Sequence, residues 1–544
     1  MSAKNYIQVI VPLKLEWEPV YSVPEGLELS EGDRVSVIFS NKEYISVVSK
    51  LHVAPREGIR ESEILPVLEK VDWLPRITEQ ELKFWKMVAS YYLCTLGEVY
   101  KSVYFQDQKP PRKWAAKDRS AIASEPALSP SARSAYELTL EAFSNRRTVL
   151  LDGAGEQLRT DIYLKLAINA VKNGKSVLYL VPGISVSALV EKRVKEVFPG
   201  VSVYHSAQTA ARKRDIVMEA RLGRPMLVLG TRSSLFIPFT NLGLVIVDQE
   251  QDIFYKQDSP APRYHARECA IMMASVCGAN VILGSDTPSL EALCNARTGL
   301  FAGIRPSGQA ADKKYPLILI DTQAERRKRG MVGEVSLKLL AEVRKVTDSG
   351  GRVLVVSWSE VPELREGTTF VTPVAVKGMS TDGFGLIAVA QADSLLGRQD
   401  FRSDERALQL LRRLNSCCPL VIQTREAAHP VFKALAKAAD TLYDNMIQER
   451  RSFGYPPFTR MVKLELTDND ENRQKLRARL LGNRLREILR PFSDPLILGP
   501  EKGEIRIFFK RDRNLTAGKA ALYGEIVSFE KHHSCHVTID VDPV

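Results

Sequence analysis

The stretch from Leu244 to Gln249 is the first whose residue types could do chemistry. Leu244–Val247 is a short, continuous apolar run, the pattern of a strand buried on both faces of a parallel sheet. Asp248 follows at the carboxyl end of this strand, where open α/β sheets place their ligands. In a nucleotide hydrolase such an acid holds Mg²⁺ and a neighbouring Glu activates water. Here the neighbour is Gln249, whose amide cannot accept the proton. A helix cap or a strand-end turn explains Asp248 equally well from this stretch alone.

A second candidate for chemistry is the segment Gly153–Thr160, which lies between a predicted strand and a predicted helix. This is the position and context of a phosphate-binding loop, GxxxxGK[ST]. Gly153 and Thr160 fit the pattern, and the Thr160 hydroxyl could reach Mg²⁺. Leu158 replaces the second glycine, where a left-handed backbone would cost about 1–2 kcal/mol and the side chain would crowd the phosphates. Arg159 replaces the lysine and exchanges a compact ammonium for a larger planar group.

Composition limits the class of protein. The chain has 544 residues, enough for three or four domains, and ordinary charged and apolar fractions. Its net charge of +11 favours a polyanionic partner such as nucleic acid, although a basic, soluble surface would give the same number. The start has no signal-peptide pattern and no apolar run approaches a membrane span. We therefore expect a cytoplasmic protein without a membrane partner.

The metal-ligating residue types do not form a recognised site. The seven cysteines contain no CxxC pair, so neither a zinc ribbon nor a disulfide framework is predicted. Four potential ligands lie close together at His532, His533, Cys535 and His536. Within one strand they would alternate between two faces, and one short segment rarely surrounds a metal tetrahedrally. We predict no metal site and expect no zinc.

The pattern along the chain predicts a multidomain α/β protein. Residues 1–106 form short β-like runs followed by two amphipathic helices, which predicts a small β-rich domain. Residues 107–130 are polar and rich in Pro, Lys and Arg, as in a linker or small surface module that could also touch nucleic acid. Residues 131–305 and 306–449 alternate strands with helices, which predicts two parallel-sheet lobes, the second of them shorter.

Residues 450–544 follow a different order, β-α-β-β-α-β, which predicts a ferredoxin-like α+β domain. Its first predicted helix, Glu471–Leu489, carries a basic face that continues one residue beyond its end. The basic residues are Lys475, Arg479, Arg486 and Arg490. This face either follows phosphates or is simply solvated.

Several segments together resemble the primosomal protein N′ (PriA) family, bacterial replication-restart helicases of superfamily 2. In the first half, VPLKLEWEPVYSVPEGLELSEGDRVSVIF resembles the family's 3′-end-binding domain. Further on, GTRSSLFIPFTNLGLVIVD, RYHAR and GSDTPSLE resemble its first helicase lobe, and DSLLGRQDFRSDERALQLL resembles its second. RRSFGYPPFTR and the terminal DVDP resemble its C-terminal domain. The resemblance covers nearly the whole chain, in order, and implies two RecA-like lobes.

The resemblance also implies partners and site residues. It implies binding of forked or single-stranded DNA, other primosome or replication proteins as partners, and ATP with Mg²⁺ as cofactors. The positions that match DNA-facing motifs or aromatic positions of the family are Tyr21, Phe39, Arg232, Arg263, Arg267 and Lys377. Ordinary ion pairing at the surface is the alternative explanation for the arginines.

The departures from the family fall on the chemistry. The phosphate loop is altered at Leu158 and Arg159, and the DEEH box appears as Asp248-Gln249-Glu250-Gln251. Cys417 stands where the first arginine that reaches the γ-phosphate is expected, and losing such an arginine costs about 10³–10⁵-fold in turnover. The chain has no room for the family's zinc module in the second lobe, and its winged-helix module is shortened to 107–130 at most.

The 3′-end pocket of the family is altered as well. Tyr21 and Phe39 match, but Pro19 stands near another aromatic position of the family, Ser40 stands for a usual glycine and Leu65 for a usual lysine. General DNA binding is therefore better supported than capture of a 3′ terminus.

Three functional hypotheses remain open. The first is a replication-restart protein that binds DNA and recruits partners with a degenerate, inactive motor. The second is a working ATP-dependent 3′→5′ helicase with unusual motifs. The third is an interaction scaffold that no longer binds DNA, and the positive net charge speaks against it.

Overall fold

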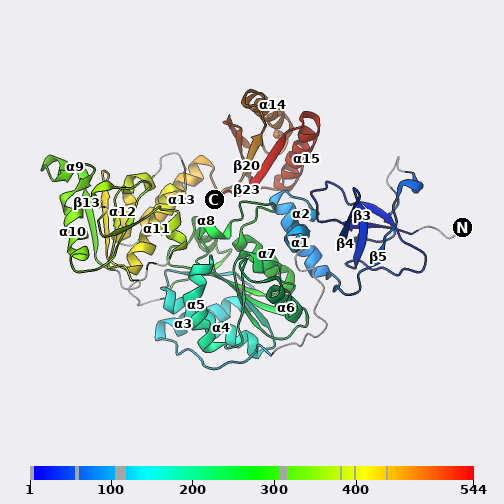
Figure 1. Cartoon of the computed structure of the whole chain (residues 1–544), viewed down its shortest axis with the longest axis horizontal. Helices are drawn as coiled ribbons and strands as arrows, with labels where there is room; N and C mark the ends of the chain where they lie inside the picture. The colour runs from blue at the N-terminus through cyan, green and yellow to red at the C-terminus, as the bar shows by residue number, and fades with distance from the viewer. Residues whose placement is uncertain are drawn as a thin grey trace.

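The structure is a computed structural model of the whole chain, and it describes residues 5–55, 60–103, 118–306, 315–364, 366–379, 381, 383–396, 400–436 and 439–544. The described part of the chain forms four larger sheets, one in each domain or lobe (Figure 1). The N-terminal sheet and the second parallel-sheet lobe lie at opposite ends, with the first lobe between them and the C-terminal sheet beside it (Figure 1). The predicted multidomain α/β architecture is confirmed.

The N-terminal domain is a small antiparallel barrel. Its sheet has the order β2-β1-β4-β3-β5. The strands are β1 (Tyr6–Ile10), β2 (Val20–Ser22), β3 (Arg34–Phe39), β4 (Lys42–Lys50) and β5 (Glu69–Lys70). The segment Leu65–Lys70 closes the sheet, because it exchanges hydrogen bonds with Ser22 on β2 and pairs with β3 through β5. The helices that follow are α1 (Glu79–Tyr92) and α2 (Leu96–Val103), with the short turn η1 (Glu61–Glu63) before them.

The first lobe is a seven-stranded parallel sheet of order β12-β6-β11-β10-β7-β9-β8. Its strands are β6 (Val149–Asp152), β7 (Ser176–Leu180), β8 (Ser202–Tyr204), β9 (Leu227–Gly230), β10 (Leu242–Asp248), β11 (Asn280–Ser285) and β12 (Ala302–Ile304). Its helices are α3 (Pro130–Ser144), α4 (Glu156–Lys172), α5 (Ile184–Val197), α6 (Ala210–Arg221), α7 (Ala266–Cys277), α8 (Leu290–Arg297), η3 (Arg232–Phe236) and η4 (Ile253–Tyr255). Strand β10 lies between β11 and β7, so the apolar run Leu244–Val247 is buried as predicted.

The second lobe is a five-stranded parallel sheet of order β13-β19-β18-β16-β17. Its strands are β13 (Leu317–Asp321), β16 (Val353–Val356), β17 (Thr368–Val371), β18 (Leu386–Val389) and β19 (Leu420–Thr424), with a separate pair β14 (Met331–Val332) and β15 (Val335–Ser336). Its helices are α9 (Thr322–Arg327), α10 (Leu337–Thr347), α11 (Ser403–Cys417), α12 (Pro430–Ala436), α13 (Asp440–Phe453), η5 (Pro362–Leu364), η6 (Ala375–Gly378) and η7 (Ala392–Leu395). The sequence predicts one helix near Val431–Arg450, which is wrong because α12 and α13 are two helices.

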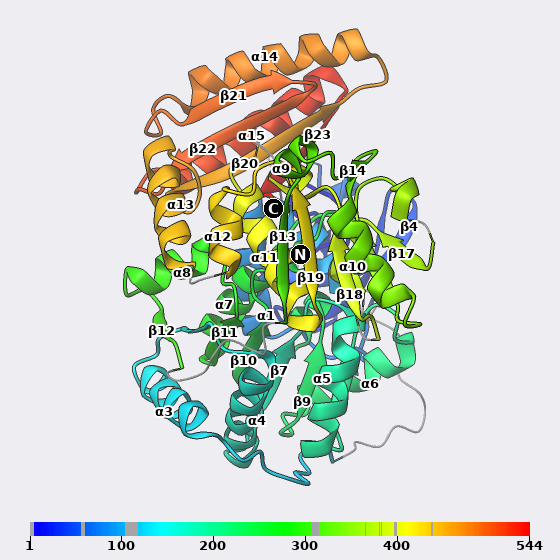
Figure 2. The same cartoon turned by 90° about the vertical axis from the view of Figure 1, so that its left-hand side faces the viewer.

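The C-terminal domain has the predicted ferredoxin-like order. Its antiparallel sheet runs β21-β22-β20-β23, and the helices α14 and α15 contact each other beside it (Figure 2). The elements are β20 (Thr459–Thr467), α14 (Glu471–Leu489), β21 (Leu496–Glu501), β22 (Glu504–Lys510), α15 (Leu515–His533) and β23 (His536–Val541).

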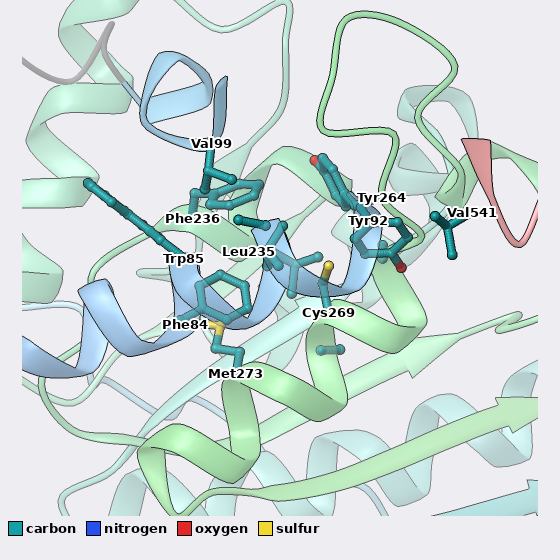
Figure 3. Packing of buried hydrophobic residues seen from close by; sticks show 14 of the residues in the cluster. Phe84, Trp85, Tyr92, Val99, Leu235, Phe236, Tyr264, Cys269, Met273 and Val541 are labelled. Atoms are coloured by element: carbon teal, nitrogen blue, oxygen red, sulfur yellow. The ribbon is translucent and has the colours of Figure 1, made fainter. Parts of the chain in front are cut away.

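Helix α1 joins three of these parts. Its buried side chains Phe84, Trp85 and Tyr92 pack in one cluster with α7 of the first lobe and with Val541 of β23 (Figure 3). Polar contacts continue the junction, because the Lys519 ammonium of α15 donates to the carbonyl oxygens of Ser90 and Tyr91 at 3.0 and 2.6 Å. The barrel is thus anchored to the first lobe and to the C-terminal domain.

Candidate nucleotide and DNA sites

The segment predicted as a phosphate loop is short. Helix α4 begins at Glu156 with Gly155 as its N-cap, so only Gly153–Gly155 separates it from β6. Gly153 has a φ of +71°, a conformation that glycine adopts without strain. Leu158 lies in the helix, 6% exposed, and packs in the core of the first lobe. The expectation that Leu158 needs a left-handed backbone is therefore wrong.

Arg159 and Asp248 form a buried ion pair. The Arg159 Nε and Asp248 Oδ1 atoms are 2.9 Å apart, and the two side chains are 2% and 1% exposed. A second guanidinium nitrogen of Arg159 donates to the Ala154 carbonyl oxygen at 2.5 Å, and the Tyr163 hydroxyl donates to Asp248 at 3.3 Å. Burial alone would lower the pKa of Arg159, but Asp248 and its other neighbours raise it, so the guanidinium stays charged. Arg159, predicted to lie beside the phosphates, and Asp248, predicted to hold Mg²⁺, thus neutralise each other.

Neither of the two residues that follow Asp248 offers a free carboxylate beside it, because Gln249 is an amide and Glu250 is hydrogen-bonded to Arg267 and Ser289. Gln249 has a φ of +50°, unusual for a non-glycine residue, and it is half-buried. Glu250 is fully buried and accepts hydrogen bonds from the Ser289 amide at 2.7 Å and from the Arg267 guanidinium at 2.7 Å. Burial raises the pKa of Glu250, and these donors oppose the rise. Glu250 therefore links the end of β10 to the start of α8.

Arg305, which the sequence analysis did not select, lies over the short loop. Its Nε is 3.8 Å from where a Cβ would stand on Gly153. The same guanidinium donates to Asp152 at 3.0 Å and to Asp440 on α13 of the second lobe at 3.2 Å. One sequence signal was available: Arg305 follows β12, and β12 is the parallel neighbour of β6, so their carboxyl ends share one sheet edge.

A second group of charged side chains lies between the lobes. Glu291 on α8 is 3.0 Å from Arg402 and 3.6 Å from Arg450 of the second lobe. Arg450 also pairs with Glu405, whose other oxygen accepts the Leu290 amide at 2.9 Å. Although burial alone would raise it, Arg402, Arg450 and Arg267 lower the pKa of Glu291. Arg450 is 1% and Glu405 is 5% exposed, so this junction is charged and buried.

The remaining predicted residues of the motor differ in exposure. Thr160 is buried in α4 behind the loop. Cys417, at the position of the first expected arginine, is exposed at the end of α11, and its thiol donates to the Arg413 carbonyl oxygen. In the part of the chain that the structure describes, no group of three or more His, Cys, Asp or Glu residues is placed to hold a metal.

The residues predicted for the 3′-end pocket do come together. Pro19, Tyr21, Phe39, Ser40 and Leu65 all line one groove on the N-terminal barrel. The Tyr21 ring is only 3% exposed and its hydroxyl donates to the Ile38 carbonyl oxygen at 2.8 Å. Burial raises the pKa of Tyr21 to about 12. Tyr21 thus lines the groove as a buried side chain, and Phe39 is the more accessible ring of the two.

The other predicted DNA-binding residues are mostly engaged within the protein. Arg232 donates to the carbonyl oxygens of Phe254 and Lys256 at 2.9 and 3.0 Å. Arg267 is buried with Glu250, as described above, while Arg263 is half-buried. The Lys377 side chain lies outside the described residues. DNA contact by these residues stays a prediction, and the burial of Arg267 favours a role in the fold instead.

Comparisons with known proteins agree in pointing to one family. A profile of the PriA 3′DNA-binding domain (3′BD) matches residues 8–104. The replication restart protein PriA of Rickettsia felis is 25% identical over 661 residues, which cover 98% of this chain and 99% of that protein. Because that alignment is longer than this chain, the relative carries insertions that this chain lacks.

Higher identities cover less of the chain. PriA of Rickettsia conorii is 31% identical over 64% of this chain and 53% of its own length. PriA of Chlamydia pneumoniae is 35% identical over 42% of this chain and 31% of its own length.

Among solved structures, the DUF1998 helicase MrfA bound to DNA and AMPPNP is similar at a TM-score of 0.37 and 10% identity, over 62% of this chain and 56% of that one. Among the helices that the structure describes, none is long and apolar enough to cross a bilayer. The chain is thus similar to PriA replication restart proteins, through the profile match at residues 8–104 and a relative aligned over almost its whole length.

Proposed function

We propose that this chain binds forked or single-stranded DNA in the cytoplasm and supports reassembly of the replication machinery without an ATP-driven motor. The observation that carries the proposal is the buried pair Arg159–Asp248. It occupies the charges that a nucleotide and its Mg²⁺ would otherwise engage.

The ion pair opposes both parts of nucleotide binding. To bind Mg²⁺, Asp248 would have to give up a buried partner, and breaking such a pair costs about 3–5 kcal/mol. To hold phosphates, Arg159 would have to turn away from the same acid. Nor would the site then hydrolyse ATP efficiently, because Gln249 cannot take the proton of the attacking water and Cys417 supplies no charge against the γ-phosphate.

Contacts between the lobes favour a static arrangement. Arg305 joins Asp152 at the end of β6 to Asp440 on α13, and Glu291 joins α8 to Arg402 and Arg450. A helicase cycle needs the lobes to move against each other, as domain closure does in other nucleotide-driven enzymes. The exposed pairs contribute little, but the buried group around Glu291 and Arg450 resists separation because each charge would lose its partner.

DNA binding is assigned to the basic part of the chain. Residues 104–544 carry 64 Lys and Arg against 50 Asp and Glu, a net charge of +14. Lys475 and Arg479 on α14 and Arg490 directly after it are exposed. Such a surface attracts a phosphate backbone without reading its sequence.

An active ATP-dependent 3′→5′ helicase is the alternative. It is favoured by the retention of Gly153, Thr160 and Asp248 on two complete parallel-sheet lobes. An interaction scaffold that has lost DNA binding is disfavoured by the charge of residues 104–544.

Fork binding should depend steeply on salt. Each phosphate that the protein neutralises contributes about −0.7 to −0.9 to the slope of log K against log salt. We expect the triple variant Lys475→Ala, Arg479→Ala and Arg490→Ala to reduce this slope by about 2, measured by fluorescence anisotropy with a labelled fork. The matched control removes three exposed lysines from the N-terminal domain, Lys42, Lys83 and Lys101, and should leave the slope nearly unchanged. A flat salt response of the unmodified protein would contradict DNA binding.

A further inference from the structure

A groove on the N-terminal barrel has a surface unlike that of a DNA site. It has a volume of about 670 Å³ and runs beside β1, β2 and the end of β3. Tyr523 of α15, in the C-terminal domain, lines its far side. The groove contains the two residues that match the 3′-end pocket of the family, Tyr21 and Phe39, and the three that depart from it, Pro19, Ser40 and Leu65.

The walls of the groove are apolar and accessible. Trp17, Ile38 and Leu65 are 42%, 37% and 50% exposed, and all three line it. The rings of Trp17 and Phe39 lie 6.4 Å apart between their centres. Single exposed apolar residues are common on protein surfaces, but several around one hollow mark a place where another molecule is bound.

The charges at the groove are mainly negative. Glu16, Glu18 and Glu63 line it, and among the lining residues that the structure describes Lys50 is the only lysine or arginine. Glu63 pairs with Arg60 at 3.0 Å, but both side chains are half or more exposed, so solvent screens this pair. Leu65 stands at a position where the family usually has a lysine, so this positive charge is missing from the groove.

The N-terminal domain around the groove also has a negative net charge. Residues 1–103 have 12 Lys and Arg against 15 Asp and Glu, a net charge of −3, whereas the rest of the chain is at +14. A negative, apolar groove repels a DNA terminus and attracts a cation that carries apolar groups.

We infer that this groove binds a basic, apolar segment of a partner protein and not the 3′ end of DNA. An aromatic or aliphatic side chain of the segment packs between Trp17, Phe39 and Leu65, and flanking Lys or Arg side chains meet Glu16, Glu18 and Glu63. The inference does not depend on whether the motor is inactive.

Selection from a random peptide library displayed on phage tests this inference with defined probes. The full-length protein is immobilised, and the enriched peptides are made with a fluorescent label for anisotropy. We expect the enriched peptides to be net positive and to carry at least one aromatic or large aliphatic residue. We expect a recessed 3′-hydroxyl end and a 3′-phosphate end on the same oligonucleotide to bind with equal affinity.

Variants locate the binding. The triple variant Glu16→Gln, Glu18→Gln and Glu63→Gln should weaken the enriched peptide about tenfold, and Trp17→Ala should weaken it comparably, with fork binding retained. The matched control, Glu25→Gln, Glu28→Gln and Glu69→Gln, removes three exposed acids of the same domain that do not line the groove, and should leave peptide binding unchanged.

Four results would overturn the inference. They are the absence of any enriched peptide, enrichment of neutral or acidic peptides, equal loss in the groove and control variants, and tighter binding of the free 3′-hydroxyl end that is lost in Phe39→Ala. Concentration-dependent dimers that are abolished by Trp17→Ala would instead assign the groove to a second copy of the chain.

Discussion

Arg159→Ala is expected to lower the free energy of unfolding by about 3–5 kcal/mol, because it leaves the Asp248 carboxylate buried without its partner. Asp248 is 1% exposed, and its remaining side-chain contact is the Tyr163 hydroxyl at 3.3 Å. Among the residues that the structure describes, Arg159 is the only cation that forms an ion pair with Asp248. Denaturant unfolding followed by far-UV circular dichroism measures the change.

A double variant separates the loss of the pair from the loss of packing. Replacing both partners by apolar residues, Arg159→Met with Asp248→Leu, should be markedly less destabilising than Arg159→Ala alone, because no buried charge is left. If Arg159→Ala were as stable as the unmodified protein, Asp248 would be accessible to solvent or to metal, and the proposal of a self-neutralised site would fail.

Arg450→Ala is expected to cost about as much, roughly 3–5 kcal/mol, because Glu405 and Glu291 lose a shared buried cation. Arg450 lies 1% exposed on α13 and connects the second lobe to α8 of the first. We therefore also expect faster proteolysis between the lobes and a larger radius of gyration by small-angle scattering.

The neighbouring residue provides the control. Arg451 is exposed, and its replacement by Ala should change the stability by about 0.5 kcal/mol or less. Equal effects of Arg450→Ala and Arg451→Ala would show that the buried group does not hold the lobes together.

The regular parts of the fold could be predicted from sequence because local pattern determines them. The apolar run Leu244–Val247 predicts the central strand, and the bounds of Glu471–Leu489 and His536–Val541 agree with α14 and β23. The break between α12 and α13 was missed because the apolar residues of both helices continue one period.

The state of the candidate site could be predicted only in part. The sequence identifies the altered residues, but not that Arg159 turns to Asp248 or that Arg305 reaches Asp152 and Asp440, because these partners are distant along the chain. It also misplaces Leu158. Since Leu158 is helical and buried, Leu158→Gly would create a cavity and weaken α4, so it is no repair of the loop.

The most direct test of the inactive motor is ATP hydrolysis and fork binding measured on one preparation. The proposal predicts that the protein binds a forked DNA while the same DNA elicits no hydrolysis above the background without enzyme. Gln249→Glu should not restore activity, because the ion pair and the missing arginine would remain. Hydrolysis by the unmodified protein at about 1 s⁻¹ or faster, within the ordinary range of enzymes, would contradict the proposal and support the active helicase.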